Sequence, residues 1–301
     1  MFSIVIPLYN KEQSIVNTIK SVLNQSYQDF EIVVVNDGST DNSLKLVEQI
    51  NDSRIRIINK PNRGVSSARN RGIKEAKSEL IALLDGDDLW EHNYLEEMNS
   101  LIIDFPDRAI WGCNYDIIDN GKHVERIVNL PILFKGELND YFDGSKNYPL
   151  FWTSSVILKK SKTIEIGGFD ERITIGEDLD LWFRMILNYP PPIFYNKVLA
   201  HYNMIDPNSA MKKKHDFSKS IMCYFDKYKE WELKNEDFAR YLNLFSCRKF
   251  IDVIVNFTED ENILEDYVNK IDKKYIPIRW NLFFKLPFKT RKTIINLLYN
   301  H

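Results

Sequence analysis

The feature that most constrains the fold is a regular alternation of short apolar runs and amphipathic segments over the first hundred residues. The short strand-like runs occupy residues 2–9, 31–37, 54–59, where charged and apolar residues alternate, and 79–85. The segments with helical periodicity occupy residues 12–25, 41–51 and 64–77. Strands separated by helices of this length are typical of βαβ units, whose parallel strands are covered by helices on both faces. The sequence therefore predicts a doubly wound α/β fold with a mostly parallel central sheet.

The rest of the chain has a different pattern. Residues 106 to about 205 mix strand-like and helical segments, and the pattern from residue 216 to the end is helical. We expect three parts, comprising residues 1–105, residues 106–215 and a helical C-terminal extension at 216–301. The hydrophobic content of 44% is sufficient for a proper core.

Composition and the start of the chain indicate a cytoplasmic protein. A net charge of −3 and the lack of a recognised module give no reason to expect nucleic acid as a partner. The three cysteines, Cys113, Cys223 and Cys247, have no CxxC spacing and suggest neither a disulfide framework nor a zinc site. The opening "MFSIVIPLYNKE" has the pattern of a strand and not of a signal peptide, and no segment reaches the roughly 18 apolar residues of a membrane span.

Unusual polar residues follow three of the expected strands. The first run ends in Pro7-Leu8-Tyr9-Asn10, the second in Asn36-Asp37-Gly38 and the fourth in Asp85-Gly86-Asp87-Asp88. Ligands of open parallel sheets bind beyond the carboxyl ends of the strands. We therefore expect these side chains to lie along one edge of the sheet.

The acidic stretch after the fourth run favours a metal site. Asp85 and Asp87 are two residues apart, so in extended geometry both carboxylates would face the same side. Such paired hard oxygens suit Mg²⁺ or Mn²⁺. The alternative is a solvent-exposed turn, and for Asp88 alone we prefer this interpretation, as the N-cap of a helix at 90–105.

Other candidate residues have both a structural and a functional interpretation. Asp37 precedes a glycine and suits an ordinary turn, or it could accept a hydrogen bond from a ring N–H of a bound base. Arg69 lies early in an expected helix, where it could contact a diphosphate. Glu177 and Asp178 stand at a helix start, where acids are favoured by the helix dipole but could also serve as a general base.

Six motifs together resemble one protein family. In order they are "IVIPLYN", "VVNDGSTDNS", "NRGVSSARNRGI", "LLDGDDLW", "GGFDE" and "GEDLDLWFR". They look like the motifs of glycosyltransferase family 2, inverting nucleotide-sugar transferases of the GT-A fold. The resemblance spans residues 2–205, about two-thirds of the chain.

The resemblance implies roles for the donor-side residues. Asp37 would contact the uracil of a UDP-sugar, Pro7 and Tyr9 would line the base pocket, and Arg69 would close it. The DXD element of the family matches Asp85 and Asp87. Asp87 would then be the more direct ligand of a diphosphate-bound Mn²⁺ or Mg²⁺.

It also implies roles for the motif at 176–184. Asp178 matches the catalytic base, and Glu177, Trp182 and Arg184 would lie on the acceptor side, with Trp182 mostly in packing. Glu177 and Asp180 are the alternative bases.

The chain departs from the family after its last core strand. Many members carry a histidine in a "YRxH" stretch, whereas this chain reads "AHYNMIDPNS" with His201 displaced and no arginine. We therefore expect His201 to be a core or surface histidine and not a phosphate or metal contact.

The implied activity is transfer of a sugar from a UDP-sugar to a hydroxyl of a glycan or lipid-linked glycan, with inversion, in surface polysaccharide or lipopolysaccharide synthesis. Residues 1–105 would bind the nucleotide sugar, and residues 106–215 would supply the acceptor-binding and catalytic half. One alternative is a nucleotidyltransferase that activates a sugar phosphate, for which the "GEDLDLW" motif has no evident use. The other is a non-catalytic nucleotide-sugar-binding protein. Such a protein would be expected to have lost at least one of four aspartates that are all present here, Asp37, Asp85, Asp87 and Asp178.

The tail at 273–301 is basic and aromatic and contains no acidic residue. Such a segment is typical of a peripheral contact with an anionic membrane, here the inner face of the plasma membrane. The alternative is a C-terminal helix whose aromatic residues pack on the catalytic domain. Pro277 and Pro287 exclude one long helix.

Overall fold

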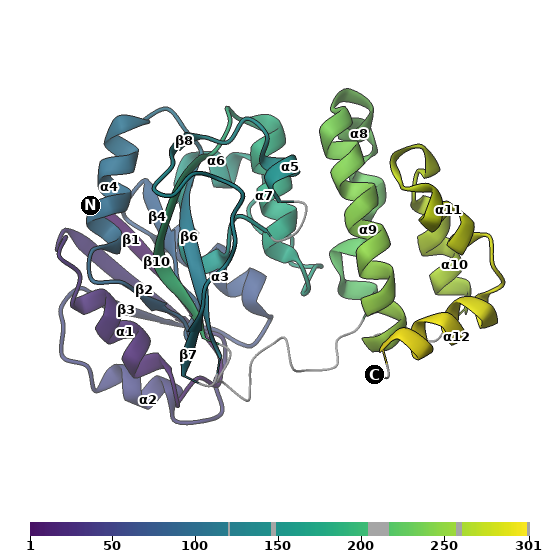
Figure 1. The fold of residues 1–301 in the computed structure, drawn as a ribbon. Helices are drawn as coiled ribbons and strands as arrows, with labels where there is room; N and C mark the ends of the chain where they lie inside the picture. Colours follow the sequence, from purple (N-terminus) through teal and green to yellow (C-terminus); the bar gives the residue numbers. More distant parts are fainter. Residues whose placement is uncertain (120, 146–148, 204–216, 257–260, 300–301) are drawn as a thin grey trace. The chain divides into compact units, whose positions relative to one another are not determined.

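The computed structural model describes residues 1–119, 121–145, 149–203, 217–256 and 261–299 (Figure 1). The chain forms two compact units. One comprises Met1–Gly144 and Pro149–Lys213, and the other comprises Ser145–Tyr148 and Lys214–His301.

The first unit is built on one mixed sheet. Within the described residues its strands are β1 (Phe2–Leu8), β2 (Phe30–Asn36), β3 (Ile55–Asn59), β4 (Leu80–Leu83), β5 (Leu89–Trp90), β6 (Ile110–Asp119), β7 (Lys122–Val124), β8 (Lys135–Glu137), β9 (Val156–Lys159) and β10 (Ile193–Asn203). Their order is β3-β2-β1-β4-β9-β6-β10-β5, with β7 beside β6 and β8 beside β10. The first four strands are parallel, as expected, whereas β9 runs antiparallel to both β4 and β6.

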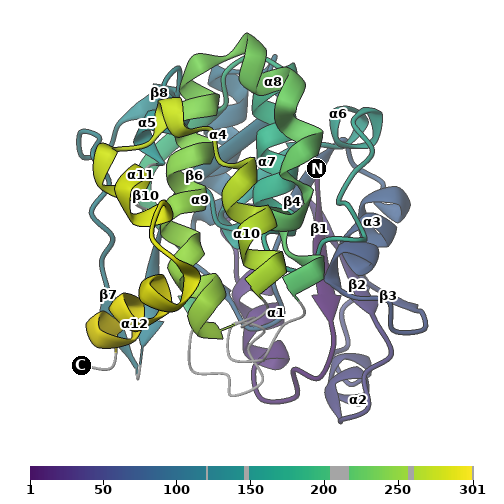
Figure 2. The same ribbon diagram turned by 90° about the vertical axis from the view of Figure 1, so that its right-hand side faces the viewer.

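Helices cover both faces of this sheet (Figures 1 and 2). They are α1 (Ile15–Leu23), α2 (Ser43–Glu48), α3 (Val65–Glu75), α4 (Tyr94–Asp104), α5 (Tyr141–Gly144), α6 (Lys160–Glu165) and α7 (Glu177–Asn188). The helix expected at 90–105 begins only at Tyr94, because Leu89–Trp90 forms a short strand against β10.

Alternating side chains of β1 face different helices. Ile4 and Ile6 belong to the apolar cluster that contains the buried side chains of α1 and α4. Val5 points the other way, toward α3, where a Cβ atom added to Gly72 would lie 2.3 Å from Val5 Cγ1. Burial on both faces explains why β1 and β2 have continuous apolar sequences, whereas the half-buried β3 alternates apolar and polar residues.

The second unit is helical, as expected. It contains α8 (Lys229–Lys234), α9 (Glu236–Asn256), α10 (Glu261–Lys270), α11 (Ile278–Phe284) and α12 (Phe288–Tyr299), together with short 3₁₀ turns (Figure 2). Phe250 of α9 stacks on Tyr267 of α10 and contacts Phe283 and Phe284 of α11. Phe283 and Phe284 of the tail therefore pack on aromatic side chains of their own unit.

Among the described residues, no helix combines the length and apolar character that crossing a bilayer requires.

Candidate active site

The loops that follow β1 and β2 are joined by hydrogen bonds. The amide N–H of Thr40 donates to Asn10 Oδ1 (2.8 Å), and the amide N–H of Lys11 donates to Ser43 Oγ (2.7 Å). At the strand ends themselves, the amide N–H of Asp37 donates to the carbonyl oxygen of Leu8 (2.8 Å). The structure thus brings the first two motifs together at the carboxyl edge of the sheet.

Asp37 and Tyr9 lie at this edge in different environments. The buried Asp37 carboxylate accepts the amide N–H groups of Arg63 (3.0 Å) and Gly64 (2.8 Å) and pairs with Lys60. Asp37 therefore fixes the loop that leads into α3. The Tyr9 side chain is 40% exposed, and Pro7 is half-buried in β1.

Arg69 connects the acidic loop after β4 with the start of α7. Only 3% of Arg69 is exposed, and it donates to Asp85 Oδ1 (2.7 Å) and to Glu177 Oε1 (2.8 Å). Burial alone would lower the pKa of the guanidinium, but Asp85 and Glu177 outweigh it and raise this pKa. One buried cation thereby holds two motifs that are separated by about ninety residues.

Asp87 is paired with a different cation. Its Oδ2 lies 2.5 Å from Lys11 Nζ, in the loop after β1. The strand ends at Leu83, and the chain then turns, with the amide N–H of Asp88 donating to the carbonyl oxygen of Asp85 (3.1 Å). The extended geometry on which the common face of the two carboxylates depended is therefore not present, and Asp85 and Asp87 contact different partners.

The assignment of Asp88 to a helix cap was wrong. Asn93 precedes the first residue of α4, whereas Asp88 is buried and accepts three hydrogen bonds. The donors are Trp152 Nε1 (2.8 Å), Ser154 Oγ (2.5 Å) and the amide N–H of Asn203 (3.1 Å). Burial and the nearby charges of Asp87 and Asp85 raise the pKa of Asp88.

Asp178 occupies the second position of α7. Its Oδ1 accepts the amide N–H of Leu179 (2.8 Å), and Thr153 Oγ1 lies 3.4 Å from its Oδ2. Burial raises the pKa of Asp178 above the ordinary value, although Arg69 opposes the shift. Burial and the charge of Asp178 likewise raise the pKa of Glu177 to about 7, against the effect of Arg69. A carboxylate with a raised pKa is a stronger base when it is ionised.

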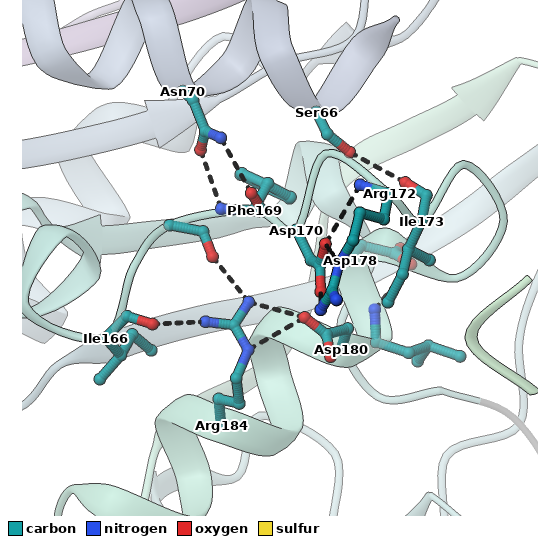
Figure 3. Close-up of polar contacts among 12 residues, drawn as sticks. Ser66, Asn70, Ile166, Phe169, Asp170, Arg172, Ile173, Asp178, Asp180 and Arg184 are labelled. Carbon is teal, nitrogen blue, oxygen red and sulfur yellow. Dashed lines mark hydrogen bonds and ion pairs between the residues drawn. The ribbon is translucent and has the colours of Figure 1, made fainter. Parts of the chain in front are cut away.

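The remaining polar residues of α7 anchor a loop. Arg184 donates through Nε (2.9 Å) and Nη2 (2.7 Å) to the buried Asp180, and also to the carbonyl oxygens of Ile166 and Gly168 (Figure 3). Asp180 is therefore engaged in a structural ion pair, which does not favour it as a base. Trp182 is fully buried and packs edge-on against aromatic rings, in agreement with a packing role.

The same loop is tied to α3 by Asn70. Its side chain donates to the carbonyl oxygen of Phe169 (2.9 Å) and accepts the amide N–H of Phe169 (2.8 Å), as Figure 3 shows. Ser66 Oγ donates to the carbonyl oxygen of Ile173 (3.2 Å). Asn70 and Ser66 lie in the motif "NRGVSSARNRGI", but nothing in that motif indicates their contacts with residues 169 and 173.

His201 is a buried histidine at the end of β10. Its Nδ1 lies 2.5 Å from Asp116 Oδ1 and its Nε2 lies 3.0 Å from Glu91 Oε1. Although burial would lower it, the two carboxylates raise the pKa of His201. None of these contacts involves Asp85 or Asp87.

The carboxylates and cations thus gather at the carboxyl edge of the parallel strands, where open α/β sheets bind their ligands. A family model described as glycosyl transferase family 2 matches residues 3–166. Because this match covers more than half of the chain, the chain belongs to glycosyl transferase family 2. The expected family and class of enzyme are confirmed.

Two relatives and one solved structure illustrate this similarity. The chain is 26% identical over 298 residues to a chondroitin synthase of Pasteurella multocida (strain Pm70), covering 94% of this chain and 29% of that protein. It is 39% identical over 129 residues to UDP-Glc:alpha-D-GlcNAc-diphosphoundecaprenol beta-1,3-glucosyltransferase WfgD of Escherichia coli, covering 42% of this chain and 51% of that protein. The crystal structure of S. aureus TarS 1-349 in complex with UDP-GlcNAc has a TM-score of 0.77 at 16% identity, covering 99% of this chain and 91% of that one.

The structural match confirms the expected GT-A type of fold with its helical extension. The chain spans less than a third of the chondroitin synthase and about half of WfgD. The activities of those longer proteins are therefore not assigned to it by the match itself.

Replacing Asp88 by alanine should destabilise the first unit. The variant removes the Asp88 acceptor from Trp152 Nε1 and from the amide N–H of Asn203, both of which are partly buried, at a cost of roughly 1–3 kcal/mol for each lost hydrogen bond. Urea unfolding measures the change, with Asp170→Ala as the control because Asp170 pairs with the exposed Arg172 (Figure 3). Equal unfolding midpoints for the two variants would contradict the buried role of Asp88.

Proposed function

We propose that this chain transfers a hexosyl residue from a UDP-sugar to a hydroxyl group of a glycan or lipid-linked glycan, with inversion at the anomeric carbon and with Mn²⁺ or Mg²⁺. The observation that carries the proposal is the double ion pair of Arg69, because it holds Asp85 and the Glu177–Asp178 pair around one point of the sheet edge. Residues 1–105 are proposed to bind the donor, and residues 106–215 to supply the acceptor and catalytic side.

On the donor side, Tyr9 and Asp37 suit a uracil. The exposed Tyr9 ring offers a stacking surface beside Pro7. The Asp37 carboxylate can accept a ring N–H, provided that the flexible ammonium group of Lys60 moves aside. Solved S. aureus TarS structures described as complexes with UDP-GlcNAc and with UDP share this fold, which supports a UDP-sugar as donor.

The donor set around the acidic loop fits a divalent cation. Asp87 and Asp85 supply hard oxygens, and each already neutralises a positive charge, that of Lys11 or of Arg69. Lys11 carries its ammonium on a flexible stem, so it can leave Asp87 and contact a phosphate. A bound Mn²⁺ or Mg²⁺ would offset the charge that develops on the departing UDP.

Asp178 is the proposed general base. It removes the proton of the acceptor hydroxyl while that oxygen forms a bond to the anomeric carbon, and the bond from this carbon to the UDP oxygen breaks on the opposite side. The in-line displacement inverts the configuration. The raised pKa of Asp178 suits it to the role of base. Glu177 is less suited to this role because it forms an ion pair with Arg69.

For the acceptor we propose a glycan of a surface polysaccharide or lipopolysaccharide, in a lipid-linked form. The name of WfgD specifies a diphosphoundecaprenol-linked acceptor, which supports this class. Contact with an anionic membrane through residues 273–301 would bring the enzyme to such an acceptor. Ile278 (77% exposed) and Leu282 (58% exposed) of α11 are apolar side chains available for it, and Lys285 and Lys289 of the same tail are also exposed.

Asp178→Asn and Asp87→Ala should separate catalysis from donor binding. Asp178→Asn removes the base, so transfer should fall by at least about a hundredfold while the affinity for UDP with Mn²⁺ is retained. Asp87→Ala should instead weaken UDP binding in Mn²⁺ but not in EDTA. Transfer is measured with a panel of UDP-, GDP- and dTDP-sugars, and UDP affinity by calorimetry. Transfer by Asp178→Asn at the parental rate would show that another group is the base.

The pH dependence of kcat/KM should report the raised pKa of Asp178. The base acts only when ionised, so the rate falls as the pH falls through its pKa, and this acid limb should lie above the pH expected from the ordinary aspartate value of 3.8. Glu177→Gln removes a neighbouring negative charge and frees Arg69 to interact with Asp178. Both effects lower the pKa of Asp178, so the acid limb should move to lower pH. If the acid limb of Glu177→Gln lies at the same pH as in the parent, the limb does not report the pKa of Asp178.

Vesicle flotation tests the proposed membrane contact. The parent should float with vesicles that contain phosphatidylglycerol but not with pure phosphatidylcholine, because the attraction is partly electrostatic. Replacing Ile278 and Leu282 together by serine should reduce flotation, whereas the control Leu233→Ser, at a site that is 89% exposed on α8, should not. A parent protein that does not float refutes the contact.

A further inference from the structure

We propose that Asp116, His123 and His201 form a second metal site, distinct from the acidic loop after β4, which binds a divalent ion of the zinc type. The three residues come from β6, β7 and β10, and each offers one ligand atom. These atoms lie within 4.8 Å of one another.

The strand register brings the three side chains to one face of the sheet. Asp116 lies directly opposite His201 in the pairing of β6 with β10. In the β6–β7 hairpin Ile118 lies opposite His123, and Ile118 is two residues from Asp116. Because side chains alternate along a strand, residues 116, 118, 123 and 201 share a face, and Asp116 and His123 are diagonal neighbours.

The two imidazoles meet at a single carboxylate. His201 Nδ1 lies 2.5 Å from Asp116 Oδ1, and His123 Nδ1 lies 2.6 Å from Asp116 Oδ2. The two rings are perpendicular, with centroids 5.2 Å apart. Glu91 lies beside the other ring nitrogen of His201, with its Oε1 3.0 Å from Nε2.

This set of ligands matches the preference of zinc. Zinc binds imidazole nitrogen and carboxylate oxygen at about 2.0–2.2 Å, so ligands in a tetrahedral site lie roughly 3.4 Å apart. The two nitrogen–oxygen distances here, 2.5 and 2.6 Å, are shorter than that value, and all three ligand atoms lie within 4.8 Å of one another, so small side-chain rotations suffice. The mixture of nitrogen and oxygen favours a borderline ion over Mg²⁺, which prefers oxygen alone.

Charge and burial also suit an ion. Asp116 and Glu91 carry two negative charges when both imidazoles are neutral, and a divalent cation balances them. Asp116 and His201 are buried and fix the site, whereas His123 is exposed and gives an ion access from solvent. The ligands include none of the residues proposed for donor binding, so this site does not depend on the proposed function.

An ion at this position would hold the end of β10. His201 lies two residues before Asn203, whose amide N–H donates to Asp88. The site therefore lies near the hydrogen bond that anchors Asp88, but it shares no ligand with Asp85 or Asp87.

The test is Zn²⁺ binding to the purified full chain after treatment with EDTA and removal of the chelator. We expect calorimetry to show one Zn²⁺ bound per chain and thermal denaturation to show stabilisation. His123→Ala should weaken Zn²⁺ binding by at least about tenfold. This variant is expected to fold, because His123 is exposed on a short hairpin strand. The matched control is His92→Ala, an exposed histidine before α4 that contacts the carbonyl oxygen of Asn24 and should not alter Zn²⁺ affinity.

A parallel titration separates this proposal from the proposed function. UDP binding in Mn²⁺ should be the same for the parent and for His123→Ala, since the variant leaves the acidic loop intact. Three results would overturn the site: no detectable Zn²⁺ binding, unchanged binding in His123→Ala, or an equal loss in His92→Ala. Any of them would show that Asp116 and its histidines form only a hydrogen-bonded ion-pair network. Loss of UDP binding in the parent would count against the proposed function alone.

Discussion

The arrangement of the strand edge depends on one buried cation. Arg69 lies almost without solvent contact between Asp85 and Glu177, and its two ion pairs join the first half of the sheet to α7. A buried guanidinium without partners would be strongly unfavourable, so both carboxylates stabilise the folded state and also lie near the proposed chemistry. The same charge moderates the pKa of Asp178, since it opposes the effect of burial.

Much of the fold follows from local pattern. β1, β2 and most of β4 come from apolar runs that are buried on both faces, the helices between the strands come from amphipathic segments, and α7 spans Glu177–Asn188, the segment interpreted as a helix from its sequence. The ends of elements were less accurate, because they depend on pairing with distant strands. The helix expected from residue 90 starts at Tyr94 for this reason, since Leu89–Trp90 pairs with β10.

The site could be predicted as a collection of residues but not as a set of contacts. Motifs located Asp85, Asp87 and Asp178, whereas the cations that pair with the first two, Arg69 and Lys11, follow only from the tertiary fold. Asp88 was misassigned because all three of its hydrogen-bond donors lie more than sixty residues away, at Trp152, Ser154 and Asn203. The histidines of the proposed second site carry no characteristic spacing either, because the pairing of three strands brings them together and not a local motif.

The absence of a side chain at Gly72 has an effect beyond its own surroundings. It lets the backbone of α3 approach β1 so closely that the isopropyl group of Val5 fills the place where a methyl group would otherwise lie. Arg69 lies one turn earlier on the same helix. The distance between α3 and the sheet therefore also determines whether the Arg69 guanidinium can contact Asp85 and Glu177. The positions of the charged side chains at the edge of the sheet thus depend on how apolar side chains pack in the interior, and selection on one constrains the other.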